Sequence, residues 1–477
     1  MVPQSVLVSL LSALCSLTIG PLVDAHSSTK GFTGSILGGS KGGQPAEVFA
    51  TAYHVLEKGR DRKNQGAVGV GDVANYHDSL MYGVMLRSLL HRGVPPAWAK
   101  ATVRIQRMPF VILQIGAFFT GSLLRERGAL TGNPLAAVFG KIVMEDVMAY
   151  ARPALLDKAF RISESDALLP QAWSDNVVWY CPSQNDCLST MSIIKHALWQ
   201  IARLRFKDGS LAIIKSSVSR YDPSVVNFDR ELVRIAFEEP LLGVLLCANG
   251  SSVGQRSRVI GALHGAFMRS KNIFSKNALK PIDKCRFWKL VMAGIVSYFV
   301  LVLRPNQRNI ITVDRANNKL VGIFLHLARD PMESQAVFFK RRAAGLKELK
   351  DACKCSCVEV WLQRLVSWCT HICRHPLFPL ARLIAIQDDT WLAVCRSSNR
   401  YSRPACRASA GFVSRWSEGW WSAVESGVES GWKVERGNRP QEAIRIEFLR
   451  TFLLGEDARG LPDELVAREA LADGLEQ

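Results

Sequence analysis

The stretch Ala172–Tyr180 constrains the fold of this chain more than any other, because it has the pattern of a tight β-hairpin. An apolar strand over 168–173 precedes the turn at 174–176, and a second apolar strand follows over 177–180. Asp and Asn favour such turns, since their short side chains bond the local backbone and tolerate unusual dihedral angles. The carboxylate of Asp175 at the tip suits a metal ligand, and it also suits an ordinary surface turn.

A second β-like run covers 66–73 and ends near Asp72. A loop and a long amphipathic helix, predicted from Pro134 to Ala151, separate this run from the hairpin. Pro suits the first helical position, and apolar residues recur at helical spacing after it. If the two strands are neighbours, Asp72 and Asp175 converge, and paired carboxylates are the oxygen ligands that magnesium prefers.

The composition describes a globular protein with a basic balance. The chain has 477 residues, a hydrophobic content of 48% and a charged content of 21%. Its length allows about two to four domains. The net charge of +18 favours a polyanionic partner, nucleic acid first and an anionic membrane second, while a merely basic soluble protein remains the alternative.

The rest of the chain gives a mixed pattern of helices and strands. Helical spacing or stop signals predict helices over 46–58, 79–92 and 186–206, and a strand over 211–214. The Gly- and Ser-rich residues 27–45 have the composition of a mobile loop. From about residue 240 the pattern is mostly helical and more basic, with a cluster of Lys and Arg over 340–350.

Twelve cysteines are scattered along the chain, which favours reduced thiols in an intracellular protein. Cys353, Cys355 and Cys357 begin a Cys/His-rich stretch that continues to His375. A zinc site is one interpretation of this stretch. The tight alternate spacing is not a usual zinc pattern, however, and no CxxC pair accompanies it.

The N-terminal run Val6–Ile19 is apolar, and small residues follow it. It is shorter than the roughly 20 residues that a membrane span needs, so we expect a buried helix. A signal peptide is the minority alternative, because no Lys or Arg precedes the run. The apolar run 290–303 is likewise expected to be a buried helix.

The order of these motifs resembles the palm of a reverse transcriptase of the non-LTR retrotransposon (LINE) type, in a truncated and partly degenerate form. The first family motif is similar to Asp72–Ser79, which places Asp72 as a metal ligand and His77 where the family has an aromatic residue against the incoming sugar. The second is similar to 127–135, and there Gly132 would line the nucleotide site.

The third family motif, an aromatic residue followed by Ala, Asp and Asp, is similar to 173–176. Asp175 matches its first carboxylate, and Asn176 replaces the second, so Asn176 would bind metal only through an amide oxygen. Downstream, Lys215 matches the lysine that faces the triphosphate. The residues 242–244 resemble the turn that grips the primer.

The resemblance implies an α+β fold, with a polymerase palm, partial fingers, a mostly helical thumb and a C-terminal region. The expected domains are partial fingers over 1–65, palm over 66–240, a thumb-like region over 241–345, a basic region over 346–450 and an acidic tail helix over 451–477.

The function implied by the resemblance is RNA-templated DNA synthesis by two-metal nucleotidyl transfer. Asp72 and Asp175 would be catalytic, Mg²⁺ would be the cofactor, and the partners would be an RNA template, a DNA primer and a dNTP, in the nucleus or cytoplasm and without a membrane. The alternative is a catalytically inactive, retroelement-derived nucleic-acid-binding protein, favoured by Asn176, His77 and Thr131. A third option is a secreted or membrane protein that begins with the N-terminal apolar run.

Overall fold

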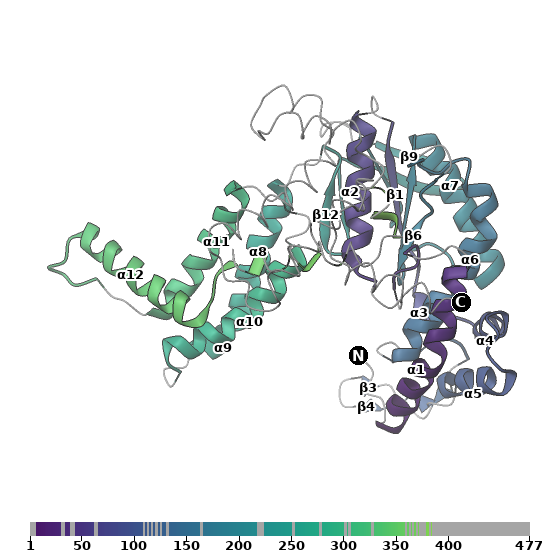
Figure 1. Ribbon diagram of the computed structural model, residues 1–477, viewed down its shortest axis with the longest axis horizontal. Coiled ribbons are helices and arrows are strands. Elements are labelled where there is room, and N and C mark those ends of the chain that lie inside the picture. The colour runs from purple at the N-terminus through teal and green to yellow at the C-terminus, as the bar shows by residue number, and fades with distance from the viewer. Residues whose placement is uncertain are drawn as a thin grey trace, which may run out of the picture. The chain divides into compact units, whose positions relative to one another are not determined.

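The computed structural model divides into two compact units, residues 1–250 with 377–380 and residues 251–376 with 381–477, and each is described by itself (Figure 1). The residues that it describes are 6–29, 34–38, 43–61, 65–107, 110–111, 114–115, 118–119, 123–124, 126–129, 133–162, 166–216, 224–249, 253–275, 279–299, 303, 307–325, 329–357 and scattered positions from 360 to 383.

The first unit combines helices with a mixed sheet. Its helices are α1 (Val6–Thr29), α2 (Pro45–Asp61), α3 (Tyr76–Ser79), α4 (Tyr82–His91), α5 (Pro96–Arg107), α6 (Pro134–Leu155), α7 (Gln184–Ala197) and the π-helix η1 (Leu198–Ala202). Its strands are β1 (Ala67–Asp72), β2 (Phe110–Val111), β3 (Gln114–Ile115), β4 (Phe118–Phe119), β5 (Leu123–Leu124), β6 (Gln171–Trp173), β7 (Asn176–Cys181), β8 (Ala212–Lys215), β9 (Ser224–Phe228), β10 (Glu231–Ile235), β11 (Glu238–Leu241) and β12 (Val244–Cys247).

Six strands form the main sheet in the order β6-β7-β1-β8-β10-β9. All neighbours are antiparallel except β8 and β10, so the sheet is mixed. The register pairs Asp72 with Asn176 across β1 and β7. The two β-like runs predicted from the sequence therefore lie side by side in the centre of one sheet.

Helices cover both faces of this sheet, as two adjacent residues of β7 demonstrate. The hydroxyl of Tyr180 donates to the carbonyl of Val48 on α2 at 3.3 Å, and the indole N–H of Trp179 donates to the carbonyl of Cys187 on α7 at 3.0 Å. Because successive side chains of a strand point to opposite faces, α2 and α7 pack on opposite sides (Figure 1). The central strands β1 and β7 are therefore buried on both faces, whereas β9 and β10 keep exposed positions.

Gly69 in β1 makes room for the largest side chain of this core. A Cβ atom at position 69 would lie 2.0 Å from the Trp179 ring, which is 1% exposed. Trp179 in turn lies near the Phe206 ring, with 6.0 Å between the centroids. A glycine in the middle of this strand is thus required by the close approach of a cross-strand indole.

The predicted helix at Pro134 is α6, and it extends four residues further, to Leu155. Asn133 caps it by accepting from the N–H of Leu135 at 2.9 Å, and Pro134 occupies the first turn. Arg92, at the end of α4, donates to Glu145 at 2.9 Å and to Asp146 at 2.8 Å on α6. A buried guanidinium paired twice in this way fixes α4 against α6.

The N-terminal apolar run lies in a longer helix than the sequence predicted. α1 continues through Pro21 to Thr29 and packs along α6, where Ile19 and Val23 are buried. The expectation of a fully buried helix is wrong for its opposite face, because Leu10 is 55% and Leu17 is 74% exposed. By length and composition alone, the stretch Val8–Ser27 is also long and apolar enough to cross a membrane.

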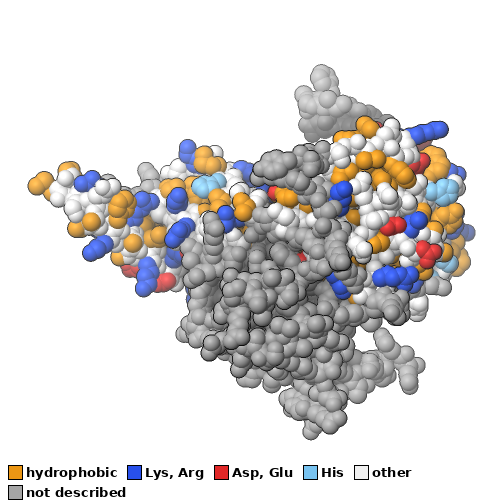
Figure 2. Space-filling view, turned by 90° about the horizontal axis from the view of Figure 1, so that it is seen from above, with side chains coloured by type: hydrophobic (Ala, Val, Ile, Leu, Met, Phe, Trp, Pro, Cys, Tyr) orange, Lys and Arg blue, Asp and Glu red, His pale blue; other side chains and the backbone are white. Residues whose placement is uncertain are grey.

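The second unit is helical in its described residues. Its elements are α8 (Val253–Arg269), α9 (Lys271–Phe274), α10 (Pro281–Phe299), α11 (Gln307–Val321), the 3₁₀ helix η3 (Gly322–Leu325) and α12 (Gln335–Cys353). Phe267, Phe274, Trp288 and Phe324 form an aromatic core with ring centroids 4.8 to 6.1 Å apart. On the face drawn in Figure 2, Lys and Arg side chains are interspersed with apolar ones.

The expected domain boundary at residues 240 and 241 falls inside the β11–β12 hairpin, whose two strands pair antiparallel in the first unit. Leu242 and Gly243 form its turn, and both have positive φ, at 49° and 79°. A turn is therefore present at the predicted position 242–244, and it belongs with the sheet-bearing unit. The expected tail helix over 451–477 lies outside the described residues.

Candidate active site

The site is built where β1 meets the β6–β7 hairpin. Asp72 ends β1, and the next residue, Val73, donates its backbone N–H to the carbonyl of Asp175 at 2.8 Å. The Asp175 carboxylate lies close enough to Asp72 for its charge to raise the pKa of the Asp72 carboxyl. Neighbouring strands therefore bring together the two carboxylates that the sequence analysis selected.

Burial and the neighbouring Asp175 charge raise the pKa of Asp72 to about 6, while the Lys207 ammonium acts in the opposite direction. The Oδ1 atom of Asp72 is buried and has no hydrogen-bond partner. A crowded carboxylate pair with an unsatisfied oxygen is stabilised by a proton or by a cation. The pair therefore has the donor chemistry of a divalent-cation site.

The hairpin turn consists of only two residues, Ser174 and Asp175, because β6 ends at Trp173 and β7 begins at Asn176. Ser174 has the left-handed φ of 56°, so the unusual dihedral falls on Ser rather than on Asp or Asn as predicted. The Asn176 amide donates to Oδ1 of Asp175 at 3.3 Å.

The segment 34–38 adds a short extended stretch beside β6. Leu37 donates its N–H to the carbonyl of Ala172 at 2.9 Å, and Ala172 donates to the carbonyl of Ser35 at 2.9 Å. A Cβ atom at Gly38 would lie 2.5 Å from the Ser174 nitrogen. Part of the stretch predicted to be a mobile loop therefore supports the hairpin from its outer side.

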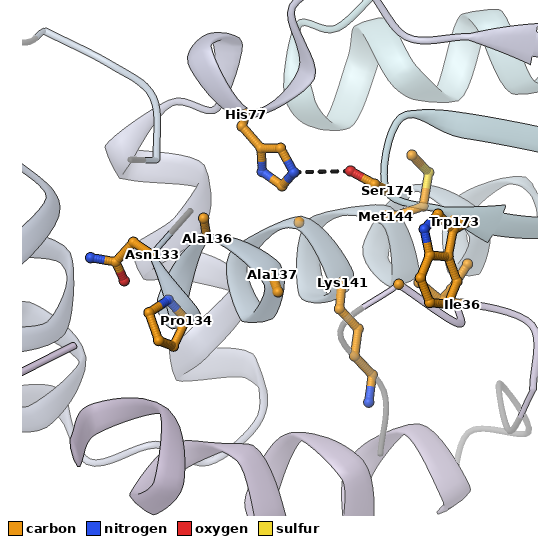
Figure 3. Close-up of a pocket in the computed structure, with 12 residues that line it drawn as sticks. Ile36, His77, Asn133, Pro134, Ala136, Ala137, Lys141, Met144, Trp173 and Ser174 are labelled. Atoms are coloured by element: carbon orange, nitrogen blue, oxygen red, sulfur yellow. Dashed lines mark hydrogen bonds between the residues drawn. The ribbon is translucent and has the colours of Figure 1, made fainter. Parts of the chain in front are cut away.

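A pocket of about 370 Å³ lies next to the hairpin tip (Figure 3). Its walls come from the segment 34–38, from α3, from the first turns of α6 and from the hairpin. The lining residues are Ile36, Gly38, His77, Asn133, Pro134, Ala136, Ala137, Gly140, Lys141, Met144, Trp173 and Ser174. A largely apolar cavity with a few polar groups, beside a carboxylate pair, is the usual form of a small-molecule site.

His77 joins the pocket to the hairpin, since its Nε2 atom lies 2.9 Å from Oγ of Ser174 (Figure 3). Burial lowers the pKa of His77, and the charges of Asp175 and Asp78 oppose this shift. His77 is therefore a neutral imidazole near pH 7. The structure places it at the pocket, where the resemblance placed an aromatic side chain.

Lys141 is a buried cation in the pocket wall, and it was not identified from the sequence. Its side chain is 3% exposed and pairs with Asp24 of α1, while Glu145 lies 3.9 Å away. In Figure 3 its ammonium points away from His77 and Ser174. The only sequence signal was a lysine on the otherwise apolar face of the predicted helix.

Of the two other predicted residues, the structure describes only Lys215. Gly132 lies outside the described residues, although Asn133 and Pro134 next to it line the pocket. Lys215 pairs with Ala67, at the opposite end of β1 from Asp72. At roughly 3.3 Å per residue, this separates Lys215 from Asp72 by about 16 Å along the strand.

Lys207 is the lysine that the structure places near Asp72. Its backbone N–H donates to the carbonyl of Asp72 at 2.7 Å, and its charge lowers the pKa of that carboxyl. It follows η1, where Arg203 has a left-handed φ of 56° and the chain turns back toward β1. The sequence analysis missed Lys207 because its helix was predicted to continue to residue 206.

The donor set for a metal is small. In the described part of the chain, no group of three or more His, Cys, Asp or Glu side chains is arranged to hold a metal ion. The oxygen donors at the site are the carboxylates of Asp72 and Asp175, with the Asn176 amide paired across the strands from Asp72. With only two charged ligands, the site fits one hard cation better than it fits a pair of cations.

No protein-family profile matches the chain, and no curated protein matches it. Among solved structures, a telomerase from Candida albicans in complex with the TWJ fragment of telomeric RNA is similar, with a TM-score of 0.36 and 9% sequence identity. The similarity covers 74% of this chain and 56% of that chain. A likeness at this level assigns neither a fold family nor an activity to this chain.

Proposed function

We propose that the chain has a reverse-transcriptase-like nucleotidyl-transfer site related to that of LINE-type elements. The observation that supports this most is the electrostatic interaction between Asp72, at the end of β1, and Asp175, at the tip of the neighbouring hairpin, beside a pocket at the start of α6. The ordered motif series in the sequence gives this geometry a chemical interpretation.

Asp72 and Asp175 would hold magnesium, with the Asn176 amide oxygen as a weak third ligand. The buried, unsatisfied Oδ1 of Asp72 fits this role, because a cation would satisfy it and relieve the repulsion that raises its pKa. When bound, magnesium supplies charge that stabilises both the attacking hydroxyl and the triphosphate. Since Asn176 brings no negative charge, we expect weak metal binding and slow synthesis.

The pocket would receive the dNTP. The small residues Ala136, Ala137 and Gly140 of α6 leave space in the pocket. The His77 imidazole lines it and is hydrogen-bonded to Ser174. Lys207 would face the triphosphate, because it is the cation whose charge acts on Asp72. The RNA template and DNA primer would lie against the basic surface of the protein, whose net charge is +18.

A second candidate function is nucleic-acid binding without catalysis. Asn176 favours it, because loss of one carboxylate removes charge from the metal site and leaves the rest of the fold in place. The basic balance of the chain fits a polyanionic partner in either case.

Primer extension on an RNA template with magnesium tests the proposal. Asp175→Ala should abolish any synthesis by the natural chain, because it removes a metal ligand, and Asn176→Asp should increase synthesis by at least about tenfold by restoring the second carboxylate. Asp157→Asn, an exposed change away from the site, serves as the matched control.

The two candidate functions give different results in this assay. Synthesis that persists in Asp175→Ala contradicts the assigned role of that residue. If Asn176→Asp stays inactive while RNA binding weakens steeply with salt, as counterion release requires, the binding function is supported instead. RNA binding that is absent or independent of salt contradicts both.

A further inference from the structure

Exposed cations alternate with buried side chains in the segment that returns from η1 to the end of β1. Phe206 pairs antiparallel with Val73, the residue after β1, and its side chain is buried. Successive side chains of extended backbone point to opposite sides, so Arg205 and Lys207 both point outward, about 6.6 Å apart along the segment. The N–H of Lys207 donates to the carbonyl of Asp72 at 2.7 Å. The cations therefore end beside the carboxylate pair.

The positive charge of this segment is not neutralised by ion pairs. Within the described part of the chain, no acidic side chain forms an ion pair with Arg203, Arg205 or Lys207. Asp208 follows them directly and is exposed, yet it pairs with none of them. Lys195 of α7, in contrast, pairs with two carboxylates of the β9–β10 hairpin. The three exposed cations are therefore available to an anionic partner.

Exposed aromatic side chains lie next to these cations. Trp199 in η1 and Tyr150 in α6 are each 51% exposed. The Tyr150 ring centroid lies 6.3 Å from that of His196, which is also exposed, three residues before Trp199. Residues three apart on a helix are neighbours on its surface. The Arg203 guanidinium lies 5.2 Å from the centroid of the Trp199 ring, so the aromatic side chains and the cations form one continuous surface.

The backbone that carries Trp199 is held from both sides. Arg87 of α4 donates to the carbonyl of Ile201 at 3.0 Å, and the N–H of Arg203 donates to the carbonyl of Trp199 at 3.1 Å. Leu198, the first residue of η1, is buried. Short π-helices are rare and occur frequently at functional sites. An exposed indole on an anchored backbone is preorganised to stack with a flat ring.

We propose that this aromatic and cationic surface binds a single-stranded nucleic acid beside the carboxylate pair. Its residues are Tyr150, His196, Trp199, Arg203, Arg205 and Lys207. Rings that stack with unpaired bases, together with cations that follow the phosphates, are the two features of single-strand sites. A duplex keeps its bases stacked on one another, so the exposed rings favour a single strand. The inference rests on the proposed function for the role of the bound strand, while the binding itself needs neither magnesium nor dNTP.

The test is fluorescence anisotropy of a labelled single-stranded RNA with the full-length chain, in EDTA, without dNTP and over a range of salt concentrations. Trp199→Ala should weaken binding at least about fivefold through the loss of one stacked base, and Trp199→Phe should retain most of the affinity. Arg205→Ser should reduce the slope of log affinity against log salt by about 0.7, because one phosphate contact is lost. The charge-matched control Arg104→Ser, exposed on α5, should leave this slope unchanged.

Four results would overturn the proposal. They are no binding by the wild-type chain, parental affinity in Trp199→Ala, an equal loss of slope in Arg104→Ser and Arg205→Ser, and tighter binding of a duplex of the same sequence. The wild-type measurements with single strand and duplex do not depend on the folding of any variant, and circular dichroism checks the variants. Lost primer extension with this binding intact contradicts nucleotidyl transfer alone. Synthesis by a chain whose affinity ignores Trp199 and Arg205 contradicts this surface alone.

Discussion

The charge of Asp175 raises the pKa of Asp72, although Asp72 ends β1 and Asp175 lies at the tip of the β6–β7 hairpin. Two like charges at this separation oppose each other in a partly buried place, and Lys207 offsets only part of that repulsion. The arrangement costs stability at neutral pH. Such a cost is expected where a fold keeps carboxylates together for binding a cation.

Asp72→Asn should therefore stabilise the metal-free protein at pH 7 to 8, by about 1 kcal/mol once solvent screening is allowed for. Folding raises the pKa of Asp72 from 3.8 to about 6, so the contribution of this group to stability is fully present below pH 3.8 and is lost as pH rises through 6. The gain in unfolding free energy of Asp72→Asn over the parent should shrink as pH falls from 7 to 4. Urea unfolding at several pH values measures it, and a variant that is less stable than the parent at pH 8 contradicts the assignment.

Gly69→Ala should destabilise the first unit by about 3 kcal/mol or more, because its methyl group would overlap the buried Trp179 ring. Gly83→Ala is the matched control, since Gly83 lies in α4 with nothing within 4 Å of its added Cβ. That change should stabilise by about 0.5 to 1 kcal/mol through helix propensity. Equal effects of the two substitutions would show that the Trp179 contact does not limit this position.

The sequence predicts the approach of Asp72 to Asp175 on condition that their strands are neighbours, because apolar runs locate the strands, Asp72 ends one of them and Asp175 lies at the hairpin tip. It does not predict where Lys215 lies, since this depends on the antiparallel pairing of β8 with β1. Because Lys215 pairs with Ala67, the lysine lies at the opposite end of β1 from Asp72. Direction and register of non-consecutive strands leave no local trace in the sequence.

Polar residues within α1 also have partners that no local pattern reveals. Ser12 accepts from the amide of Asn133 at 2.6 Å, and Ser27 donates to Glu145 at 2.5 Å. Asp24 pairs with Lys141 of the pocket wall. From the sequence, Ser12 only interrupts the apolar run, and Asp24 and Ser27 lie beyond its predicted end. The structure pairs Asp24 and Ser27 with residues of α6 and Ser12 with its cap residue Asn133. The row of partners explains why the helix continues beyond the predicted end at Ile19.

Asp24→Ala should destabilise the first unit by about 1 to 2 kcal/mol, because it leaves the buried Lys141 ammonium with only Glu145 nearby. Asp157→Ala, an exposed change just beyond α6, should lie within about 0.5 kcal/mol of the parent. Chemical denaturation followed by Trp fluorescence compares the two. Similar midpoints for both variants would show that α1 does not depend on this ion pair.

Lys207→Met should raise the pKa of Asp72 above 6, because it removes the positive charge that favours the ionised carboxyl. Lys215→Met removes the same charge from the opposite end of β1 and should leave that pKa unchanged. Magnesium binding needs the ionised carboxylate, so its pH midpoint should move upward in Lys207→Met alone. Isothermal titration with magnesium between pH 5 and 8 measures this midpoint. Charges screened by water and salt act only over short distances, so only the lysine close to Asp72 should change its ionisation. An upward shift of the pH midpoint in Lys215→Met, without one in Lys207→Met, would therefore contradict the assignment of Lys207 and place Lys215 at the site.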